Sequence, residues 1–110
     1  MQYALLIYSR TEGSRPEAER SGPIDPRVAA VLERPYVQSW ARLRDPESAT
    51  TIRNNAGKPL LVDGPFIDSK EFLGGVIVVE TDDLDGALAI ADELQQTRTD
   101  GAIEVRPMLG

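Results

Sequence analysis

Residues 74–94 read GGVIVVETDDLDGALAIADEL and join a strand directly to a helix. The Gly pair opens Val76–Val79, and a run that is apolar at every position is typical of a strand covered on both faces. Asp82 or Asp83 is then placed to cap a helix. The apolar residues of this helix recur at helical spacing, at Leu84, Ala87, Leu88, Ala91 and Leu94. The stretch therefore predicts a buried strand followed by an amphipathic helix.

A second strand of this kind is predicted near the start of the chain, where Tyr3–Tyr8 is apolar throughout. Residues 9–23 carry charges, Gly and Pro, so we expect a flap or a flexible loop there. Asp25 and Pro26 suit the cap and the first position of a helix. We expect Pro35 to kink this helix or to split it. Its apolar residues are expected to be Val28, Val31, Leu32, Val37, Trp40 and Leu43.

The remaining β-rich runs complete a mixed fold. Residues 49–53 and 59–62 flank the turn-forming residues 54–58 and predict a hairpin, and residues 102–106 alternate like a half-buried strand. The order is therefore strand, helix, hairpin, strand, helix, strand. Right-handed crossovers then predict an α+β, ferredoxin-like sandwich of four to five strands with two helices on one face.

The face of this sheet that carries no helix predicts the oligomeric state. Tyr3–Tyr8 and Val76–Val79 send apolar side chains toward both faces, and an exposed apolar surface of that extent marks an interface. We therefore expect a homodimer that packs sheet against sheet. The alternative is a monomer in which the hairpin and residues 9–23 fold over the open face.

Composition narrows the class of protein. The 110 residues suffice for one domain, residues 1–110, and a formal charge of −6 makes nucleic acid and anionic membranes unfavourable partners. The chain has no Cys and no His, which excludes thiolate and imidazole chemistry. We find no metal-ligand cluster, phosphate loop or dinucleotide fingerprint, so no metal and no cofactor is expected. Without a signal-peptide pattern or an apolar run long enough to cross a bilayer, the expected location is the cytoplasm.

Several strings resemble the YCII-related family, in its DGPF-motif branch. They are Asp63-Gly64-Pro65-Phe66, followed by Lys70-Glu71-Phe72-Leu73-Gly74-Gly75, with Tyr3–Tyr8 at the other end of the chain. The resemblance implies a dimeric α+β barrel, in agreement with the homodimer expected from the strands. It implies little chemistry, because most members have no established function. A His–Asp pair has been proposed as catalytic in certain branches, but this chain has no His.

Asp63 is the candidate catalytic residue, because it follows an apolar strand at a position where sites are often built. A buried Asp63 could act as a general acid or base, with Glu71 as a second carboxylate. The competing interpretation of Asp63 is an ordinary turn residue, and that of Glu71 is a solvated ion pair with Lys70. Tyr8 and Arg53 could hold an anionic substrate.

Two aromatic side chains complete the candidate site. Phe66 and Trp40 could form its apolar walls, although core packing is the default for a lone Trp. Two functions stay open. One is a small cofactor-independent enzyme that uses Asp63 on a small anionic or polar metabolite. The other is a non-catalytic ligand-binding or accessory module that keeps the barrel without the chemistry.

Overall fold

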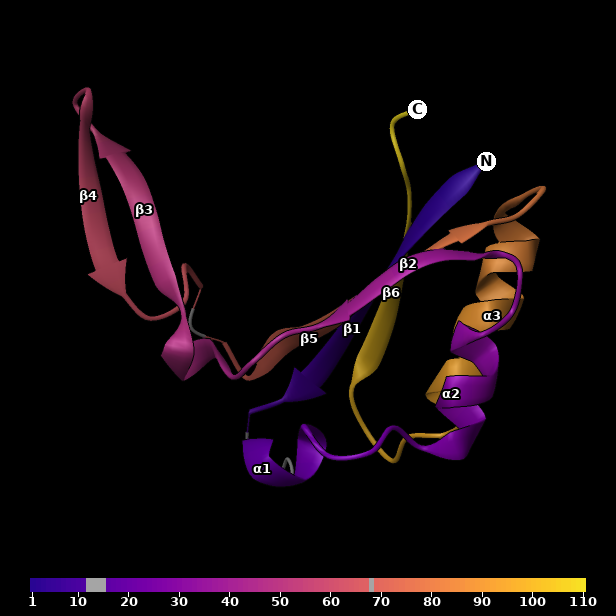
Figure 1. Ribbon diagram of the computed structural model, residues 1–110. Coiled ribbons are helices and arrows are strands. Elements are labelled where there is room, and N and C mark those ends of the chain that lie inside the picture. Colours follow the sequence, from indigo (N-terminus) through magenta and orange to yellow (C-terminus); the bar gives the residue numbers. More distant parts are fainter. Residues whose placement is uncertain (12–15, 68) are drawn as a thin grey trace.

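The computed structural model describes residues 1–11, 16–67 and 69–110 and contains a four-stranded antiparallel sheet (Figure 1). The strands lie in the order β2, β5, β1, β6, which is the order of a ferredoxin-like sandwich. This arrangement confirms the predicted fold class. The bounds of the strands are β1 Gln2–Arg10, β2 Val37–Arg42, β5 Glu71–Glu80 and β6 Ala102–Pro107.

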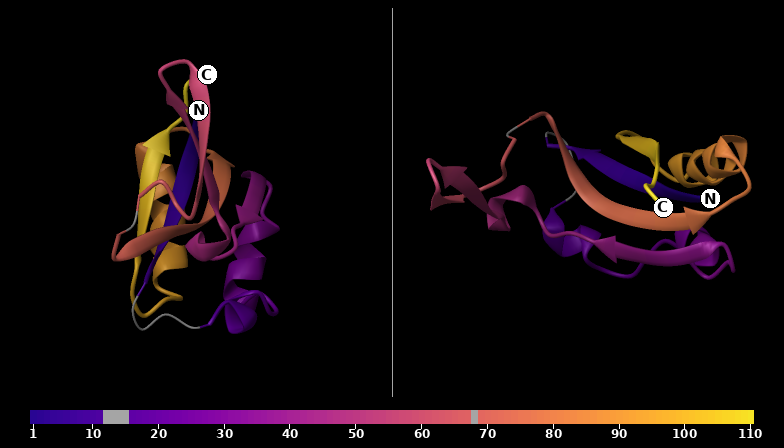
Figure 2. Two further views of the ribbon diagram at one scale, coloured as in Figure 1. Left: turned by 90° about the vertical axis from the view of Figure 1, so that its left-hand side faces the viewer. Right: turned by 90° about the horizontal axis from the view of Figure 1, so that it is seen from above.

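Helices α2 (Pro26–Leu32) and α3 (Leu84–Gln95) pack against each other on one face of the sheet (Figures 1 and 2). Both begin at the predicted type of cap. The Asp25 carboxylate accepts a hydrogen bond from the Arg27 backbone N–H at 2.8 Å, and Asp83 accepts one from Gly86 at 3.0 Å. The short helix α1 (Glu17–Arg20) and the 3₁₀ helix η1 (Pro46–Ser48) lie in the connections. Across the described ranges, no helix has the length and apolarity needed to cross a membrane.

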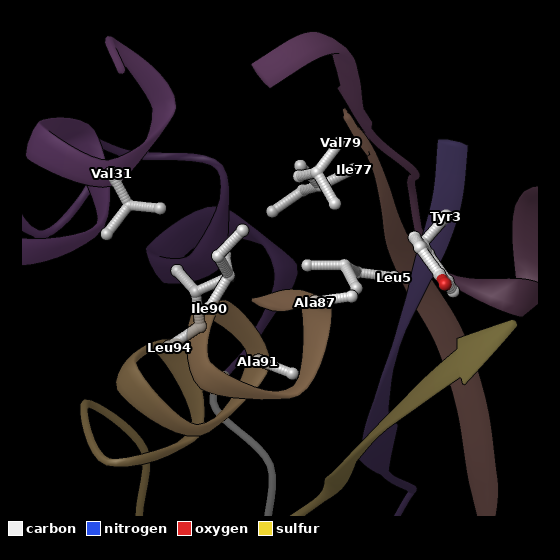
Figure 3. Close-up of a cluster of buried hydrophobic side chains, with 9 residues drawn as sticks. All are labelled: Tyr3, Leu5, Val31, Ile77, Val79, Ala87, Ile90, Ala91 and Leu94. Atoms are coloured by element: carbon white, nitrogen blue, oxygen red, sulfur yellow. The ribbon is translucent and has the colours of Figure 1, made fainter. Parts of the chain in front are cut away.

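The core lies between the helices and the sheet (Figure 3). Leu5 and Val79 are fully buried there, together with Tyr3, Val31, Ile77, Ala87, Ile90, Ala91 and Leu94. The predicted apolar stripe of α3 was wrong in part, because Leu84 and Leu88 are each 46% exposed. The buried positions 87, 90, 91 and 94 keep the spacing of one helix face, but that face is centred on Ile90.

The helix predicted to continue to Leu43 was wrong beyond Pro35. Helix α2 ends at Leu32, and Val37–Arg42 form the edge strand β2 instead. Val37 pairs with Val79 and Trp40 pairs with Ile77, with a register shift after Val37 that adds one residue to β2. This bulge turns both side chains toward the helices although they are three residues apart. Three residues is also helical spacing, which is why the pattern resembled a helix.

The predicted hairpin is present, but it lies outside the main sheet. Strands β3 (Thr50–Asn55) and β4 (Lys58–Asp63) form a separate two-stranded sheet that projects from the body (Figures 1 and 2). Its turn residues Ala56 and Gly57 have φ angles of 54° and 84°, as a two-residue hairpin turn requires. We call residues 50–63 the arm. The arm extends away from the sheet and does not fold over the open face of its own chain, in the described part of the structure.

The segment predicted as a flap, residues 9–23, is partly regular. Strand β1 continues through Arg10, and helix α1 follows at Glu17–Arg20. Residues 12–15 lie outside the described residues. Whether the segment acts as a flap stays a prediction.

Candidate functional site

A cavity of about 690 Å³ opens on the helix-covered side of the sheet, where β2 ends. Cavities of this size are typical of small-molecule sites. Residues of α1, α2 and α3 and of all four strands of the main sheet form its walls. The apolar part of the wall consists of Ile7, Val28, Leu32, Trp40, Ile77, Leu94 and Ile103.

The floor of the cavity is bare backbone at Gly74 and Gly75. The pairing of β1 with β5 shifts register between Ile7 and Tyr8, which leaves Gly74 as the extra residue of a bulge. Gly75 pairs with Ile7 on one side and with Arg42 on the other. A Cβ atom at Gly75 would lie 3.2 Å from the carbonyl oxygen of Ala41. The Gly pair therefore lets the neighbouring strands approach closely and, because it has no side chains, leaves the cavity open.

Trp40 and Arg42 stand side by side on this wall, because alternate residues of β2 face the same side of the sheet. Trp40 is the single Trp of the chain and is 45% exposed. Arg42 donates from Nη1 to the carbonyl oxygens of Arg20 at 3.2 Å and of Gly22 at 3.0 Å. Among the described residues, Nε and Nη2 of Arg42 have no hydrogen-bond partner. That edge of the guanidinium can bind a carboxylate or a phosphate.

Arg98 also lines the cavity, and its hydrogen bonds join three segments of the chain. Its Nη2 donates to the Tyr8 carbonyl oxygen at 2.5 Å, and its Nη1 donates to the Ala102 carbonyl oxygen at 3.3 Å and to Gln95 Oε1 at 3.1 Å. Burial lowers the pKa of Arg98, although the charge of Asp100 opposes this shift. An Arg remains charged at neutral pH, so Arg98 is a cation whose hydrogen bonds are largely used within the chain.

The other charged side chains of the cavity wall are Glu19, Arg20, Asp25 and Asp100. Arg20 forms an ion pair with Asp45 and lies 5.1 Å from the ring centre of Phe72. Asp25 caps α2 and pairs with Arg27 at 2.8 Å. Glu19 is exposed on α1 at the rim. In the portion of the chain that the structure describes, no group of carboxylates is placed to hold a metal ion.

The structure does not bring the predicted site residues together. Trp40 lines the cavity, but from a strand and not from a helix. Asp63 and Arg53 lie on the exposed arm, and Arg53 stacks 5.1 Å above the ring of Phe66. Phe66 itself is exposed. None of these three residues lines the cavity.

The last two predicted residues lie on the main sheet, away from the cavity. Tyr8 pairs with Leu73 and Ala102 and points to the face opposite Ile7. Glu71 is an exposed residue at the start of β5 and pairs with Arg10.

Sequence reasoning missed Arg42 and Arg98. The Gly pair at residues 74–75 did give a usable signal, because such a pair is typical of a bulge or of a close backbone approach to a ligand, and the structure has a bulge there. The alternation of Trp40 and Arg42 was also visible, but it is informative only once residues 37–42 are recognised as a strand.

Comparison with known proteins agrees with the fold. The YCII-related domain family matches residues 1–109. The chain is also similar to an uncharacterized protein of Rhizobium meliloti (strain 1021), with 32% identity over 114 aligned positions. The alignment covers 98% of this chain and 92% of that protein. Both similarities extend over the sheet, the arm and the helices, so this chain belongs to the YCII-related domain family.

Proposed function

We propose that the chain binds a small organic anion with an apolar part in the cavity beside Trp40. The observation that carries the proposal is the pairing of this apolar wall with the edge of the Arg42 guanidinium that has no partner among the described residues. A ligand carboxylate on Arg42 would leave its apolar part against Trp40 and the bare Gly75 floor. Most small-molecule sites combine apolar walls with a few polar groups that fix orientation.

The charges around the cavity favour an anion over a cation. The Asp25 carboxylate already accepts hydrogen bonds from the backbone N–H and from the guanidinium of Arg27. Asp100 acts on the nearby charge of Arg98. Among the described residues, Arg42 is thus a cation of the cavity wall whose Nε and Nη2 keep hydrogen-bond donors for a ligand.

Binding without catalysis is the version that this geometry supports best. A catalytic version, with Asp63 as general acid or base, is the alternative, and Tyr8, Arg53, Phe66 and Glu71 as ligand-binding residues belong to it. An acid or base must come within hydrogen-bond reach of the reacting atom. Asp63 lies on the arm and is not on the cavity wall, which favours the binding module. The string Asp63-Gly64-Pro65-Phe66 supports placing the chain in the DGPF branch of its family.

The fluorescence of Trp40 tests the proposal without any label. Benzoate and hexanoate should change the emission saturably, whereas neutral benzamide should not. Arg42→Gln should weaken benzoate binding about tenfold or more, because a hydrogen bond to a charged group is worth about 1.5–3 kcal/mol. Arg53→Gln is the matched control on the arm and should leave the affinity unchanged. The proposal fails if neither carboxylate binds, or if Arg42→Gln binds benzoate as well as the native chain does.

The same assay separates binding from catalysis by Asp63. Asp63→Asn should leave both the benzoate affinity and its pH dependence unchanged if the cavity acts alone. A clear change in either would support the catalytic alternative.

We also propose that two chains pair through the open face of the main sheet. This face carries the half-buried apolar residues Ala4, Leu6, Val76 and Val78. Light scattering should report twice the chain mass of 12.0 kDa at micromolar concentration. A mass of one chain would contradict the pairing but would leave the ligand proposal untouched.

A further inference from the structure

The arm has one covered face and one bare face. Cross-strand partners share a face, so Arg53 and Leu60 lie on one side of the arm and Ile52 and Leu61 on the other. Phe66 contacts the Arg53 side from the segment that follows the arm. Ile52 and Leu61 are 67% and 68% exposed. The Ile52–Leu61 pair is therefore an apolar surface without a cover from the described residues.

This exposure is unusual for a hairpin, because a two-stranded sheet alone is at best marginally stable in water. Every residue of the arm except Thr51 is exposed, and the extensive contacts of β3 and β4 are with each other. Exposed apolar strands of this kind also invite pairing with other chains. The arm therefore needs a partner surface that the described part of its own chain does not supply.

We propose that the Ile52–Leu61 face of the arm packs on the open sheet face of a second copy of this chain. Each chain carries one bare arm and one apolar face, so a two-fold pair covers both surfaces in each copy. The proposal adds an arm contact to the sheet-to-sheet pairing. It does not depend on the ligand-binding function.

Complementary charges indicate where on the open sheet face the arm of the partner copy packs. Asp63 is two residues after Leu61 in β4 and faces the same side of the arm. On the open sheet face, Arg106 pairs with Ala4 and uses Nη2 for its ion pair with Glu104. The remaining nitrogens of Arg106 can bind a carboxylate from the partner copy. Asp63 and Arg106 are complementary charges on the two surfaces that the proposal joins.

The topology makes this ion pair possible between chains and not within one chain. The arm joins the body at the end of the sheet where β2 ends and β5 begins. Ala4 pairs with Val78, seven residues along β5 from Glu71. Seven residues of strand span roughly 24 Å. Asp63 lies at the base of the arm, so it cannot reach the Arg106 of its own chain across that distance. In a two-fold dimer with antiparallel strands, the Arg106 of the partner copy lies at the end of the sheet where the arm begins.

Cysteine crosslinking tests the contact cleanly, because the native chain has no Cys. Chains with Leu61→Cys and ¹⁵N-labelled chains with Ala4→Cys are mixed, treated with a short bismaleimide, and analysed by mass spectrometry. The expected product joins one labelled and one unlabelled chain. Leu60→Cys, on the other face of the arm, is the matched control and should give far less product. An unchanged far-UV circular dichroism spectrum would show that each variant is folded.

Three results would overturn the proposal. Crosslinking of Leu61→Cys with itself would show that arms pack on arms. Crosslinking within a single chain carrying both substitutions would show that the arm folds back. Crosslinking of Ala4→Cys with itself, without the mixed product, would leave a sheet-to-sheet dimer that does not use the arm.

Charge reversal provides a second measurement. Asp63→Arg and Arg106→Asp should each weaken the dimer about tenfold, as measured by sedimentation equilibrium. The two substitutions together should restore most of the lost affinity, because the ion pair is then re-formed in reverse. Equal dimer affinity in all four proteins would contradict the proposed contact.

Discussion

The sheet and the arm are both built from apolar β-strands, but in the described part of the chain only the sheet is covered by other segments. Leu5 in β1 is fully buried, whereas Leu61 in β4 is 68% exposed. The connections explain the difference. Helices cross between β1 and β2 and between β5 and β6, and they return over one face of the sheet. A two-residue turn joins β3 to β4, so none of the described helices returns over the arm.

This comparison shows what apolar strand residues do and do not predict. Their pattern predicts that a strand needs a cover. It does not predict whether the cover comes from a crossover helix of the same chain or from another molecule. The length of the connection after the strand carries that information.

The largest expected effect compares Leu5 with Leu61. Leu5→Ala should lower the free energy of unfolding by about 2–5 kcal/mol, because it leaves a cavity in the core. Leu61→Ala should change it by less than about 0.5 kcal/mol in dilute protein, as exposed substitutions usually do. Urea denaturation at low concentration measures both. A loss at Leu61 as large as that at Leu5 in dilute protein would show that the arm is covered within its own chain.

A smaller effect compares two glycines with positive φ angles, Gly101 in the body and Gly57 in the arm. Their φ angles are 80° and 84°, so an Ala is strained at both. At Gly101 the added Cβ atom would also lie 2.4 Å from the Tyr8 carbonyl oxygen, whereas nothing lies within 4 Å at Gly57. Gly57→Ala should therefore lower stability by about 1 kcal/mol, and Gly101→Ala by clearly more.

Thermal unfolding of the two Ala variants measures this difference. Gly57→Ala is the internal control, because it isolates the strain of the backbone from the clash with Tyr8. Equal losses in the two variants would mean that the body tolerates the added atom as easily as the arm does.

Much of the fold could be predicted because its signals are local. Strand β1, the hairpin and the start of α3 each depend on residues within a few positions of one another, as the Asp83 cap shows. The end of the first helix could not be predicted in this way. Residues Val37 and Trp40 have helical spacing, and only their pairing with the distant β5 shows that a bulge produces it.

The candidate site depends still more on distant contacts. The hollow exists because Gly75 is paired with Ile7 and Arg42, which come from three separate segments. No local pattern gives this register. Trp40 could be proposed as a wall residue from its chemistry alone, whereas Asp63 was proposed from its position after a strand. That strand belongs to the arm, so the position carries no information about the cavity.

The smallest expected effect concerns an ion pair on the surface of the body, for which the arm has no counterpart in the described residues. Arg34, after α2, donates from Nη1 and Nη2 to the two carboxylate oxygens of Glu93 on α3, each at 2.7 Å. These hydrogen bonds hold the pKa of Glu93 below its ordinary value of 4.5. A carboxylate whose pKa is lower in the folded state stabilises the fold above its unfolded pKa, and this contribution is lost as the pH falls through the folded pKa.

Glu93→Gln should therefore make stability slightly less dependent on pH below about 4.5, where the native chain loses this contribution. The effect is small because both side chains are largely exposed to solvent. Carboxyl ¹³C shifts measure the pKa of Glu93 directly, and Arg34→Gln should return it toward 4.5. An unchanged Glu93 pKa in Arg34→Gln would mean that the two helices are joined by their apolar contact alone. The body would then differ from the arm only in what covers its apolar side chains.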